Sequence, residues 1–377
     1  MEKGSDGEPD RRRVWTDVGD TGPMTAVSLA DLGGWSTILG QLTAGSDLDA
    51  VQTEAAMAEI LDGDATSAQI AGFIVALRMK GETVDELTGL VAAMIDKAVP
   101  VPLPDLDGVV DIVGTGGDRT SSINVSTLAA IVVAGAGGRV CKHGNRAASS
   151  ACGAADLLEA LGVAIELGPA GVARCVDEAG IGFCFAPRFH AAMRHAVPTR
   201  RELGVPTVFN ILGPLANPAR VRRQVTGVAD PSMAERMVQV LAANGTARAL
   251  VLYGHDGLDE LTTTTTSTVH ELRDGDIRTY VVDPRPLGLA AATVEDLRGG
   301  DAATNAELAR QVLAGEKGAR RDIVVLNAAA GLVAAGQVED LGSGLDVARA
   351  AIDDGSAART LDRFVKVSQG AAQGGHA

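Results

Sequence analysis

Apolar residues recur at intervals of three and four between residues 28 and 99, a spacing typical of helices that bury one face. The pattern predicts helices over residues 35–42, 47–61 and 66–80, and a further helix that begins near residue 83. Thr83 and Glu86 stand at capping-box spacing at that last start. The segment contains no predicted strand and no obvious chemistry, so we expect a small helical domain over residues 28–99.

A proline-rich stretch, residues 100–104, separates this segment from a different pattern. Proline disfavours helix in the residue before it, so the stretch predicts a boundary or hinge. Beyond it, apolar runs of strand length alternate with helical stretches, which is typical of a mostly parallel sheet flanked by helices. The predicted strands are residues 109–113, 139–141, 181–185, 249–253 and 323–326, and the predicted later helices are residues 305–313, 322–335 and 344–353.

Some stretches give a weaker or divided signal. Residues 323–326 fit a strand by themselves and a helix as part of residues 322–335, and the threonine run over residues 262–266 fits a strand or a loop. Residues 1–27 mix charges with glycine and proline and predict a disordered tail, and residues 370–377 predict a frayed end.

The stretch between Pro187 and Pro218 is rich in proline, arginine and histidine. We expect helices from about residues 188–212 to leave the sheet and pack on the helical domain. The chain therefore predicts an α/β fold class, in which a small N-terminal helical domain is hinged to a larger α/β domain, residues 100–377, with a mostly parallel central sheet flanked by helices.

One helix starting at Ala191 would carry several arginines of this stretch. Arg194 and Arg201 would share a face one heptad apart, and Arg200 would point about a third of a turn away. At least one of the three should then face inward or toward a ligand.

Composition and charge narrow the class of protein. The 377-residue chain is 46% hydrophobic but only 3% aromatic, and its net charge of −15 opposes a general nucleic-acid binder. Its basic residues nevertheless gather near the glycine, proline and histidine motifs, which suits an anionic small-molecule substrate. These residues are Lys142, Arg146, Arg188, Arg194, Arg200 and Arg201.

Four cysteines, at positions 141, 152, 175 and 184, have no zinc or redox spacing and have apolar neighbours, so they predict buried, reduced thiols. No stretch is long and apolar enough for a transmembrane helix, and the N-terminus lacks a signal-peptide pattern. We therefore expect a cytoplasmic protein that binds neither membrane nor nucleic acid.

The first stretch with candidate chemistry follows the apolar run over residues 109–113. Gly114, Gly116 and Gly117 come next, and Asn124, Ser126 or Thr127 could cap the apolar helix that starts near residue 128. A strand, a glycine loop and a helix N-terminus form the arrangement that binds phosphate. A tight turn that needs glycine for positive φ explains the glycines equally well.

Two further polar loops follow predicted strands. Residues 142–150 bring lysine, histidine, asparagine, arginine and serine together, and each can bind a phosphate, a ribose hydroxyl or a carboxylate. Residues 254–261 hold Asp256, Asp259 and Glu260. These carboxylates suit Mg²⁺ beside a phosphate site, although Asp and Gly also form ordinary turns. Two phosphate-like loops elsewhere favour the metal.

Five motifs stand in an order that resembles the anthranilate phosphoribosyltransferase family. They are GTGGD at residues 114–118, NVST at 124–127, KHGNR at 142–146, FNILGPL at 209–215 and GLDE at 257–260. The likeness spans about residues 28–364. It implies a homodimer that transfers a 5-phosphoribosyl group from phosphoribosyl pyrophosphate to the amino group of anthranilate, in tryptophan biosynthesis, with Mg²⁺ as cofactor.

The resemblance also implies roles for individual residues. The phosphoribosyl pyrophosphate site would comprise Gly114, Gly117, Asp118, Ser122, Asn124, Val125, Ser126, Thr127, Lys142, His143, Gly144, Asn145, Arg146, Ala147, Ala148, Ser149, Ser150 and Ala154. Anthranilate would meet Gly114, His143, Asn145 and Arg200, with Arg200 on its carboxylate. Ser126, Asp259 and Glu260 would bind Mg²⁺, and Lys142 and Arg200 would be the catalytic residues. Ser122 stands where threonine is usual, and Ala154 where a small hydroxyl residue is frequent.

Two other functions compete with this interpretation. A pyrimidine nucleoside phosphorylase shares the expected architecture, and residues 156–159 resemble that family. A non-catalytic relative that binds nucleic acid is opposed by the net charge and by the intact pair Asp259 and Glu260.

Overall fold

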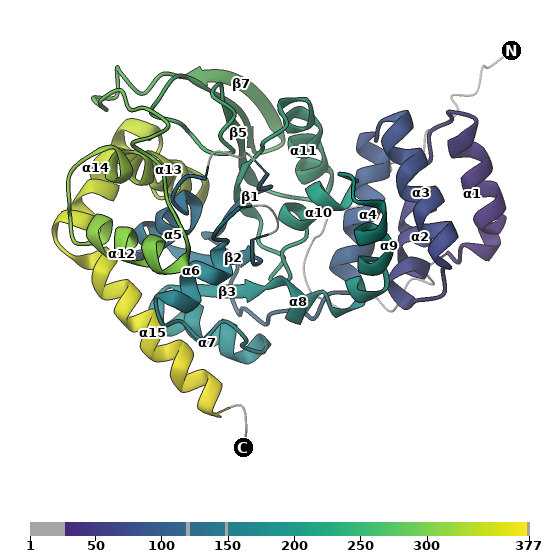
Figure 1. Cartoon of the computed structure of the whole chain (residues 1–377), viewed down its shortest axis with the longest axis horizontal. Helices are drawn as coiled ribbons and strands as arrows, with labels where there is room; N and C mark the ends of the chain where they lie inside the picture. The colour runs from purple at the N-terminus through teal and green to yellow at the C-terminus, as the bar shows by residue number, and fades with distance from the viewer. Residues whose placement is uncertain (1–26, 118–120, 148–149, 375–377) are drawn as a thin grey trace, which may run out of the picture.

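The computed structural model describes residues 27–117, 121–147 and 150–374. A helical lobe and a larger α/β lobe lie side by side (Figure 1). The helical lobe contains η1 (Ala30–Leu32), α1 (Gly34–Thr43), α2 (Ala50–Asp62), α3 (Ser67–Lys80) and α4 (Val84–Asp96). All four predicted helices of this segment are confirmed. The predicted tail lies, except for Val27, outside the described residues.

Side-chain caps set where these helices begin. Asp49, Thr66 and Thr83 precede α2, α3 and α4, and each accepts a hydrogen bond from a backbone N–H three residues later. In α4 the Glu86 side chain returns a bond to the cap, so the predicted capping box is confirmed. The starts of these three helices are therefore specified by residues next to them in the sequence.

The α/β lobe is built on a seven-stranded sheet in the order β3-β2-β1-β4-β5-β6-β7. Its strands are β1 (Val109–Gly114), β2 (Arg139–Gly144), β3 (Ile181–Phe185), β4 (Arg223–Gly227), β5 (Arg248–Gly254), β6 (Ser267–Arg273) and β7 (Asp276–Val282). The first five are parallel, and β6 and β7 add an antiparallel hairpin at one edge. The mostly parallel sheet is confirmed.

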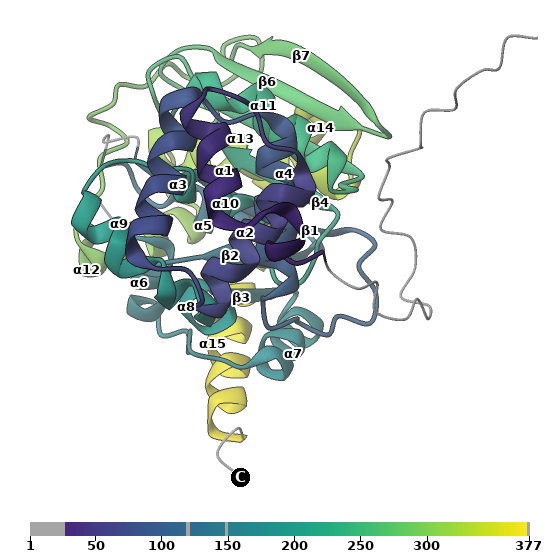
Figure 2. The same ribbon diagram turned by 90° about the vertical axis from the view of Figure 1, so that its right-hand side faces the viewer.

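Helices cover both faces of the sheet. On one face, α5 (Val125–Gly135) and α13 (Ala319–Ala335) pack on β1 and on each other, and on the other face α11 (Pro231–Ala243) packs on β5 and β6. Figure 2 shows the helical lobe in front of this second face. The remaining helices of the lobe are α6 (Ala154–Ala160), α7 (Pro169–Ala179), α12 (Ala302–Leu313), α14 (Leu341–Asp353) and α15 (Ser356–Gly374).

Successive side chains of β5 belong alternately to two hydrophobic cores. Leu250 and Leu252 belong to the core under α5 and α13, whereas Ala249 and Val251 belong to the core that α11 shares with the helical lobe. Successive strand residues point to opposite faces, so one strand contributes to both cores. The helical lobe is thus packed on the sheet lobe through α11.

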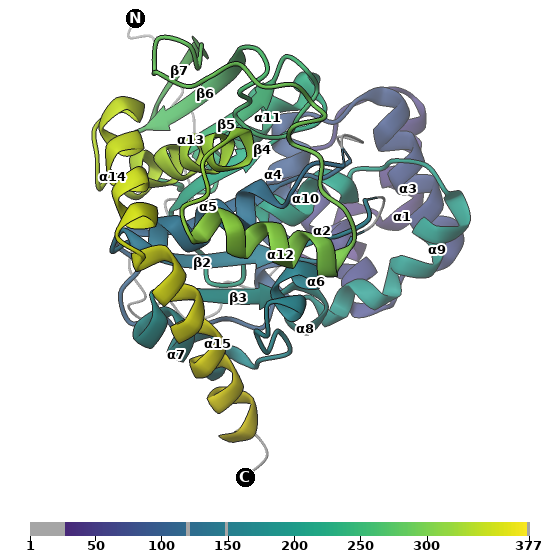
Figure 3. The same cartoon turned by 60° about the vertical axis from the view of Figure 1, so that its left-hand side comes forward.

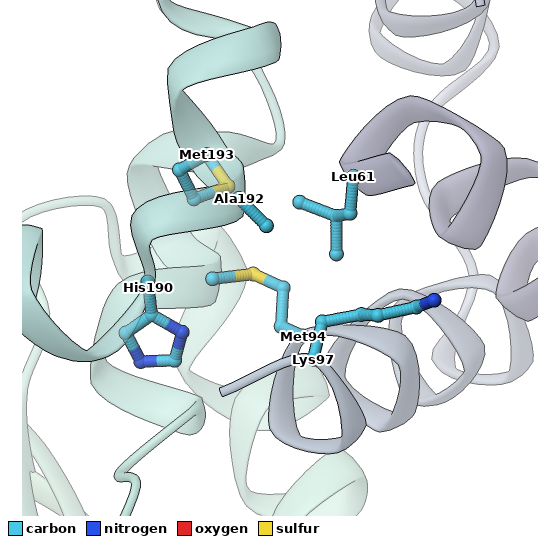
Figure 4. A pocket seen from close by; sticks show the side chains of 6 residues that line it. All are labelled: Leu61, Met94, Lys97, His190, Ala192 and Met193. Atoms are coloured by element: carbon cyan, nitrogen blue, oxygen red, sulfur yellow. The ribbon is translucent and has the colours of Figure 1, made fainter. Parts of the chain in front are cut away.

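Four short helical pieces connect the two lobes: α8 (Ala186–Phe189), η2 (Ala191–His195), α9 (Val197–Leu203) and α10 (Phe209–Leu215). η2, α9 and α10 lie against α2, α3 and α4 in turn, whereas α8 lies against β3 and η2. The proline-rich stretch beside them is neither helix nor strand. Val99, just before it, and Val101, within it, donate backbone hydrogen bonds to Phe189 O and Pro218 O, at 2.9 and 3.2 Å. At this junction the side chains of Leu61, Met94 and Met193 converge (Figure 4).

Several predicted elements are wrong. Residues 323–326 belong to α13 and not to a strand, because the surrounding seventeen residues form one buried helix that overrides the local β-branched run. The helix expected from Ala191 is broken into η2 and α9, and Pro198 stands in the first turn of α9, where its missing N–H costs nothing. Gly370 to Gly374 are helical rather than frayed.

Three strands were not predicted at all. β4 carries Arg223 and Gln224 in a strand of only five residues, and β6 and β7 mix charged and polar residues with apolar ones. The threonine run over residues 262–266 is a loop that leads into β6.

Candidate active site

The strand order creates a crevice where the site is expected. The chain runs from β1 outward to β2 and β3 on one side and from β4 outward to β5 on the other, so the strand order reverses between β1 and β4. In open α/β sheets, ligands bind at the carboxyl ends of strands at such a switch point. The described parts of all three predicted loops, after β1, β2 and β5, meet at this edge.

The loop after β1 needs its glycines for conformation. Gly116 and Gly117 have φ of 68° and 86°, a region that glycine enters without strain. Gly114 is needed for a different reason, because a Cβ there would lie 2.5 Å from Asp259 Oδ2. The turn interpretation is therefore correct for two glycines, and close approach of a carboxylate explains the third.

Asp259 and Glu260 lie directly against this loop. Gly116 N–H donates to Asp259 Oδ2 at 2.8 Å, and Ser126 N–H, in the first turn of α5, donates to Glu260 Oε1 at 3.0 Å. Both carboxylates are buried. A helix N-terminus and a glycine loop are anion sites, and in this structure carboxylates occupy two of their amide donors.

Lys142 lies beneath the start of α5. Its ammonium group donates to Ile112 O and to Ser126 Oγ, the latter at 3.3 Å, and only 2% of the residue is exposed. Burial lowers the pKa of Lys142, while the negative charges of Asp111, Glu260 and Asp259 act in the opposite direction. The Lys142 side chain thus lies close enough to Asp259 and Glu260 to be influenced by their charges.

His143 is buried and neutral. Its Nδ1 lies 3.0 Å from Gly213 O, and since a carbonyl only accepts, Nδ1 carries the proton. Its Nε2 is buried with no hydrogen-bond partner in the described part of the chain. Burial, reinforced by the His190 ring 5.1 Å away, lowers the pKa of His143 to about 3. At neutral pH it therefore presents an uncharged surface.

Asp156 organises the loop after β2. Its carboxylate accepts the N–H groups of Ala147 and Gly153, both at 2.9 Å, and the Arg146 guanidinium at 2.9 Å. Arg146 also pairs with Glu159 at 2.8 Å. Arg146, expected on the donor phosphate, is thus engaged in holding its own loop. The residues 156–159 that resemble a phosphorylase serve the same loop.

The other predicted donor residues differ in exposure. Asn145 and Ser150 are exposed, Ser122 and Asn124 are half-buried, and Gly117 faces solvent. Val125 and Thr127 are buried, and the Thr127 hydroxyl has no hydrogen-bond partner in the described part of the chain. Gly144 packs against Ala154, whose Cβ would lie 3.4 Å from a Cβ at residue 144. Asp118, Ala148 and Ser149 lie outside the described residues.

Arg200 is the inward-facing arginine that the sequence predicts. It is half-buried on α9, its guanidinium carbon lies 4.9 Å from the centroid of the Phe209 ring, and burial lowers its pKa. Arg194 and Arg201 are exposed. The expectation is confirmed, although the single helix on which it was based does not exist.

The residues that hold the site in place were mostly missed. Asp111 Oδ1 accepts His143 N–H at 3.1 Å and Asp111 Oδ2 accepts Asn217 Nδ2 at 2.8 Å, and a charge inside the apolar run over residues 109–113 was the available signal. Gly227 has no such signal, yet a Cβ there would lie 1.6 Å from Asp259 O. Asp256 binds Leu258 N–H and the Thr262 hydroxyl, so its role is the turn.

Residues that could bind a metal ion are present but do not form a complete set. No group of three or more His, Cys, Asp or Glu side chains comes together within residues 27–117, 121–147 and 150–374. Asp259, Glu260 and the Ser126 hydroxyl are hard oxygen donors of the kind Mg²⁺ prefers. Oxygen atoms of a substrate would have to complete its coordination. The four cysteines are free and buried, as predicted.

The fold and the site define a glycosyl transferase. Residues 106–358 match the family described as "Glycosyl transferase family, a/b domain", and residues 36–98 match its helical bundle domain.

Within this class, the chain belongs to the anthranilate phosphoribosyltransferase family. It is 54% identical over 344 residues to the anthranilate phosphoribosyltransferase of Rhodococcus jostii (strain RHA1), covering 90% of this chain and 94% of that protein. The crystal structure of anthranilate phosphoribosyltransferase from Thermus thermophilus has a TM-score of 0.83 at 42% identity, covering 88% of this chain and 99% of that one. The Saccharomyces cerevisiae enzyme in complex with PRPP and Mg has a TM-score of 0.81 at 27% identity, covering 89% and 98%.

Proposed function

We propose that this chain transfers the 5-phosphoribosyl group of phosphoribosyl pyrophosphate to the amino group of anthranilate. The products are N-(5-phosphoribosyl)anthranilate and pyrophosphate, and the step belongs to tryptophan biosynthesis. The observation that carries the proposal is the meeting of the glycine loop, Lys142 and the pair Asp259 and Glu260 at the sheet switch point. The names of the relatives give the same reaction.

The donor site has the features that this leaving group requires. Displacing pyrophosphate at the anomeric carbon builds negative charge on the leaving oxygens. The Lys142 ammonium and the positive end of α5 are fixed before the reaction and can stabilise that charge, whereas the Gly116 and Ser126 amides are held by Asp259 and Glu260. Asn145 and Ser150 are exposed beside them and can bind the rest of the donor.

The residues present also fit Mg²⁺. Ser126, Asp259 and Glu260 would hold the ion, which when bound supplies positive charge to the leaving pyrophosphate. Asp259 and Glu260 now accept backbone amides, so they are already oriented toward the phosphate-binding loop. The yeast structure with PRPP and Mg supports this cofactor.

The acceptor needs orientation rather than activation. The amino group of anthranilate is neutral at pH 7 and needs no strong base, and the neutral His143 is consistent with this. Arg200 would pair with the carboxylate and aim the amine at the donor. Gly114 and Asn145 would line the seam between the two substrates.

A single assay tests the proposal. The fluorescence of anthranilate is followed with phosphoribosyl pyrophosphate and Mg²⁺, and we expect it to fall only when all three are present. Phosphorolysis of uridine or thymidine without anthranilate turnover would instead establish the nucleoside phosphorylase. Salt-dependent DNA binding without any turnover would establish the non-catalytic alternative.

We also propose that the enzyme is a cytoplasmic homodimer whose lobes follow the predicted division into residues 28–99 and 100–377. No helix in the described part of the chain is long and apolar enough to cross a membrane. Sedimentation equilibrium of the purified chain and cell fractionation would test both statements. A monomer at micromolar concentration, or activity in the membrane fraction, would contradict them.

A further inference from the structure

We propose that Asn305, a residue in none of the five motifs, is a positioning residue that locks the two donor loops together and keeps the N-terminus of α5 open for the donor. The inference rests on the proposed function, because it assigns Asn305 to the donor half of that site. Asn305 lies near the start of α12, which packs beside α6 and α15 (Figure 3). Only 2% of it is exposed.

The amide of Asn305 bridges two segments. Its Nδ2 donates to Asn124 Oδ1 at 2.9 Å, across 181 residues of sequence, and its Oδ1 accepts Gly300 N–H at 2.7 Å. A Cβ at Gly299 would lie 2.5 Å from Asn305 Oδ1, so that glycine permits the approach. Buried amide bonds of this kind fix both partners, because breaking one leaves a polar group unsatisfied.

The Gly300 end of this link holds the loop after β1. The segment that precedes α12 runs beside that loop: Ile123 N–H donates to Leu297 O at 3.0 Å, and Gly299 N–H donates to Ser121 O at 2.8 Å. Ser122 and Arg298 form an antiparallel bridge between them. Fixing Gly300 therefore fixes the strand-like contact that carries Ser122.

The Asn124 end reaches the loop after β2. Asn124 Nδ2 donates to Cys152 O at 2.9 Å, so the amide of Asn124 joins Asn305 on one side to the second donor loop on the other. One continuous chain of hydrogen bonds thus runs from Gly300 through Asn305 and Asn124 to Cys152.

This chain of hydrogen bonds affects what the start of α5 can bind. Asn124 is the N-cap of α5, yet its side chain makes no capping bond to the helix. An N-cap asparagine ordinarily accepts the N–H of the second or third helical residue, which here are Ser126 and Thr127. Ser126 N–H already donates to Glu260 Oε1, and because Asn305 and Cys152 hold the Asn124 side chain, the Thr127 N–H is the amide left uncapped for an anion.

The test measures binding of Mg²⁺-pyrophosphate by calorimetry together with steady-state kinetics. Asn305→Ala should weaken pyrophosphate binding and raise the KM for phosphoribosyl pyrophosphate roughly tenfold, since it frees Asn124 to cap the helix. The KM for anthranilate should stay within about twofold of wild type. Asn305→Ser, which leaves a smaller cavity but cannot reach Asn124, should behave alike.

Two comparisons separate positioning from general destabilisation. Ser368→Ala, on α15, removes another buried tertiary bond, which the Ser368 hydroxyl accepts from Ala164 N–H at 3.0 Å. This variant should leave donor binding unchanged. The double variant that combines Asn124→Ala with Asn305→Ala should weaken pyrophosphate binding no more than the worse single variant does, because both substitutions break the same chain of hydrogen bonds.

The inference is overturned if Asn305→Ala and Asn305→Ser keep wild-type affinity for pyrophosphate. It is equally overturned if the losses of pyrophosphate affinity from Asn124→Ala and Asn305→Ala multiply in the double variant. The same holds if Ser368→Ala weakens donor binding as much as Asn305→Ala does. A wild-type chain that binds pyrophosphate but does not transfer to anthranilate would instead contradict the proposed function.

Discussion

The two halves of the site are built in different ways. The donor half is fixed by hydrogen bonds that join distant parts of the chain, such as Gly116 to Asp259 and Ser126 to Glu260. The acceptor half, as we propose it, depends on Arg200, which stands on a seven-residue helix and is placed by packing over Phe209. The donor site is therefore preorganised, and the acceptor site is set by how the lobes pack.

The two hydrophobic cores explain this difference. The donor loops follow strands whose side chains fill the core under α5 and α13, whereas α9 and α10 pack on the core of the helical lobe. A small shift between the lobes would move Arg200 relative to Lys142 and leave the donor loops intact. Separate variants should then affect the two substrates separately.

The largest effect is expected from removing both carboxylates of the donor half. Asp259→Asn with Glu260→Gln should reduce Mg²⁺-dependent turnover by roughly a thousandfold or more, because the ion loses its charged ligands. The control is Asp274→Asn with Asp276→Asn, in the β6–β7 turn, which makes the same change in net charge far along the sheet. Initial rates across a Mg²⁺ titration measure the effect. Parent-like rates in the first double variant would remove the metal from this pair.

A smaller, substrate-specific effect is expected in the acceptor half. Arg200→Ala should lower kcat/KM for anthranilate by roughly tenfold to a hundredfold, the value of a charge-assisted bond, with little change in the KM of the donor. Arg201→Ala is the matched control, since it removes the neighbouring, exposed arginine of the same helix. If Arg200→Ala changes both KM values equally, the two halves are not independent and the carboxylate role is wrong.

The same contrast explains how much of the site could be predicted from the sequence. The donor loops follow strands with clear apolar runs, and Gly114, Lys142 and Glu260 stand in local motifs, so their meeting could be predicted. At least one of Arg194, Arg200 and Arg201 was predicted to face inward from a single helix, which in fact is divided into η2 and α9. Asn305, Asn217 and Gly227 act through partners up to 181 residues away, and such contacts leave no local pattern.

The smallest effect concerns the contact between His143, near the end of β2, and His190, between α8 and η2. Burial lowers the pKa of both, that of His143 to about 3. Between this value and 6.5 the imidazole of His143 is protonated in the unfolded chain but not in the folded one. The free energy of unfolding should therefore fall by about 2 kcal/mol on account of His143 as pH falls from 7 to 5.

Asp111, with its pKa raised by burial to about 6, acts in the opposite direction within the same pH window. The measurement is therefore a difference between wild type and His143→Asn, in urea unfolding at pH 7 and pH 5. The variant should lose less stability on acidification, and a double variant with His190→Asn should lose less still. Equal losses in all three proteins would mean that burial does not lower the pKa of these two histidines.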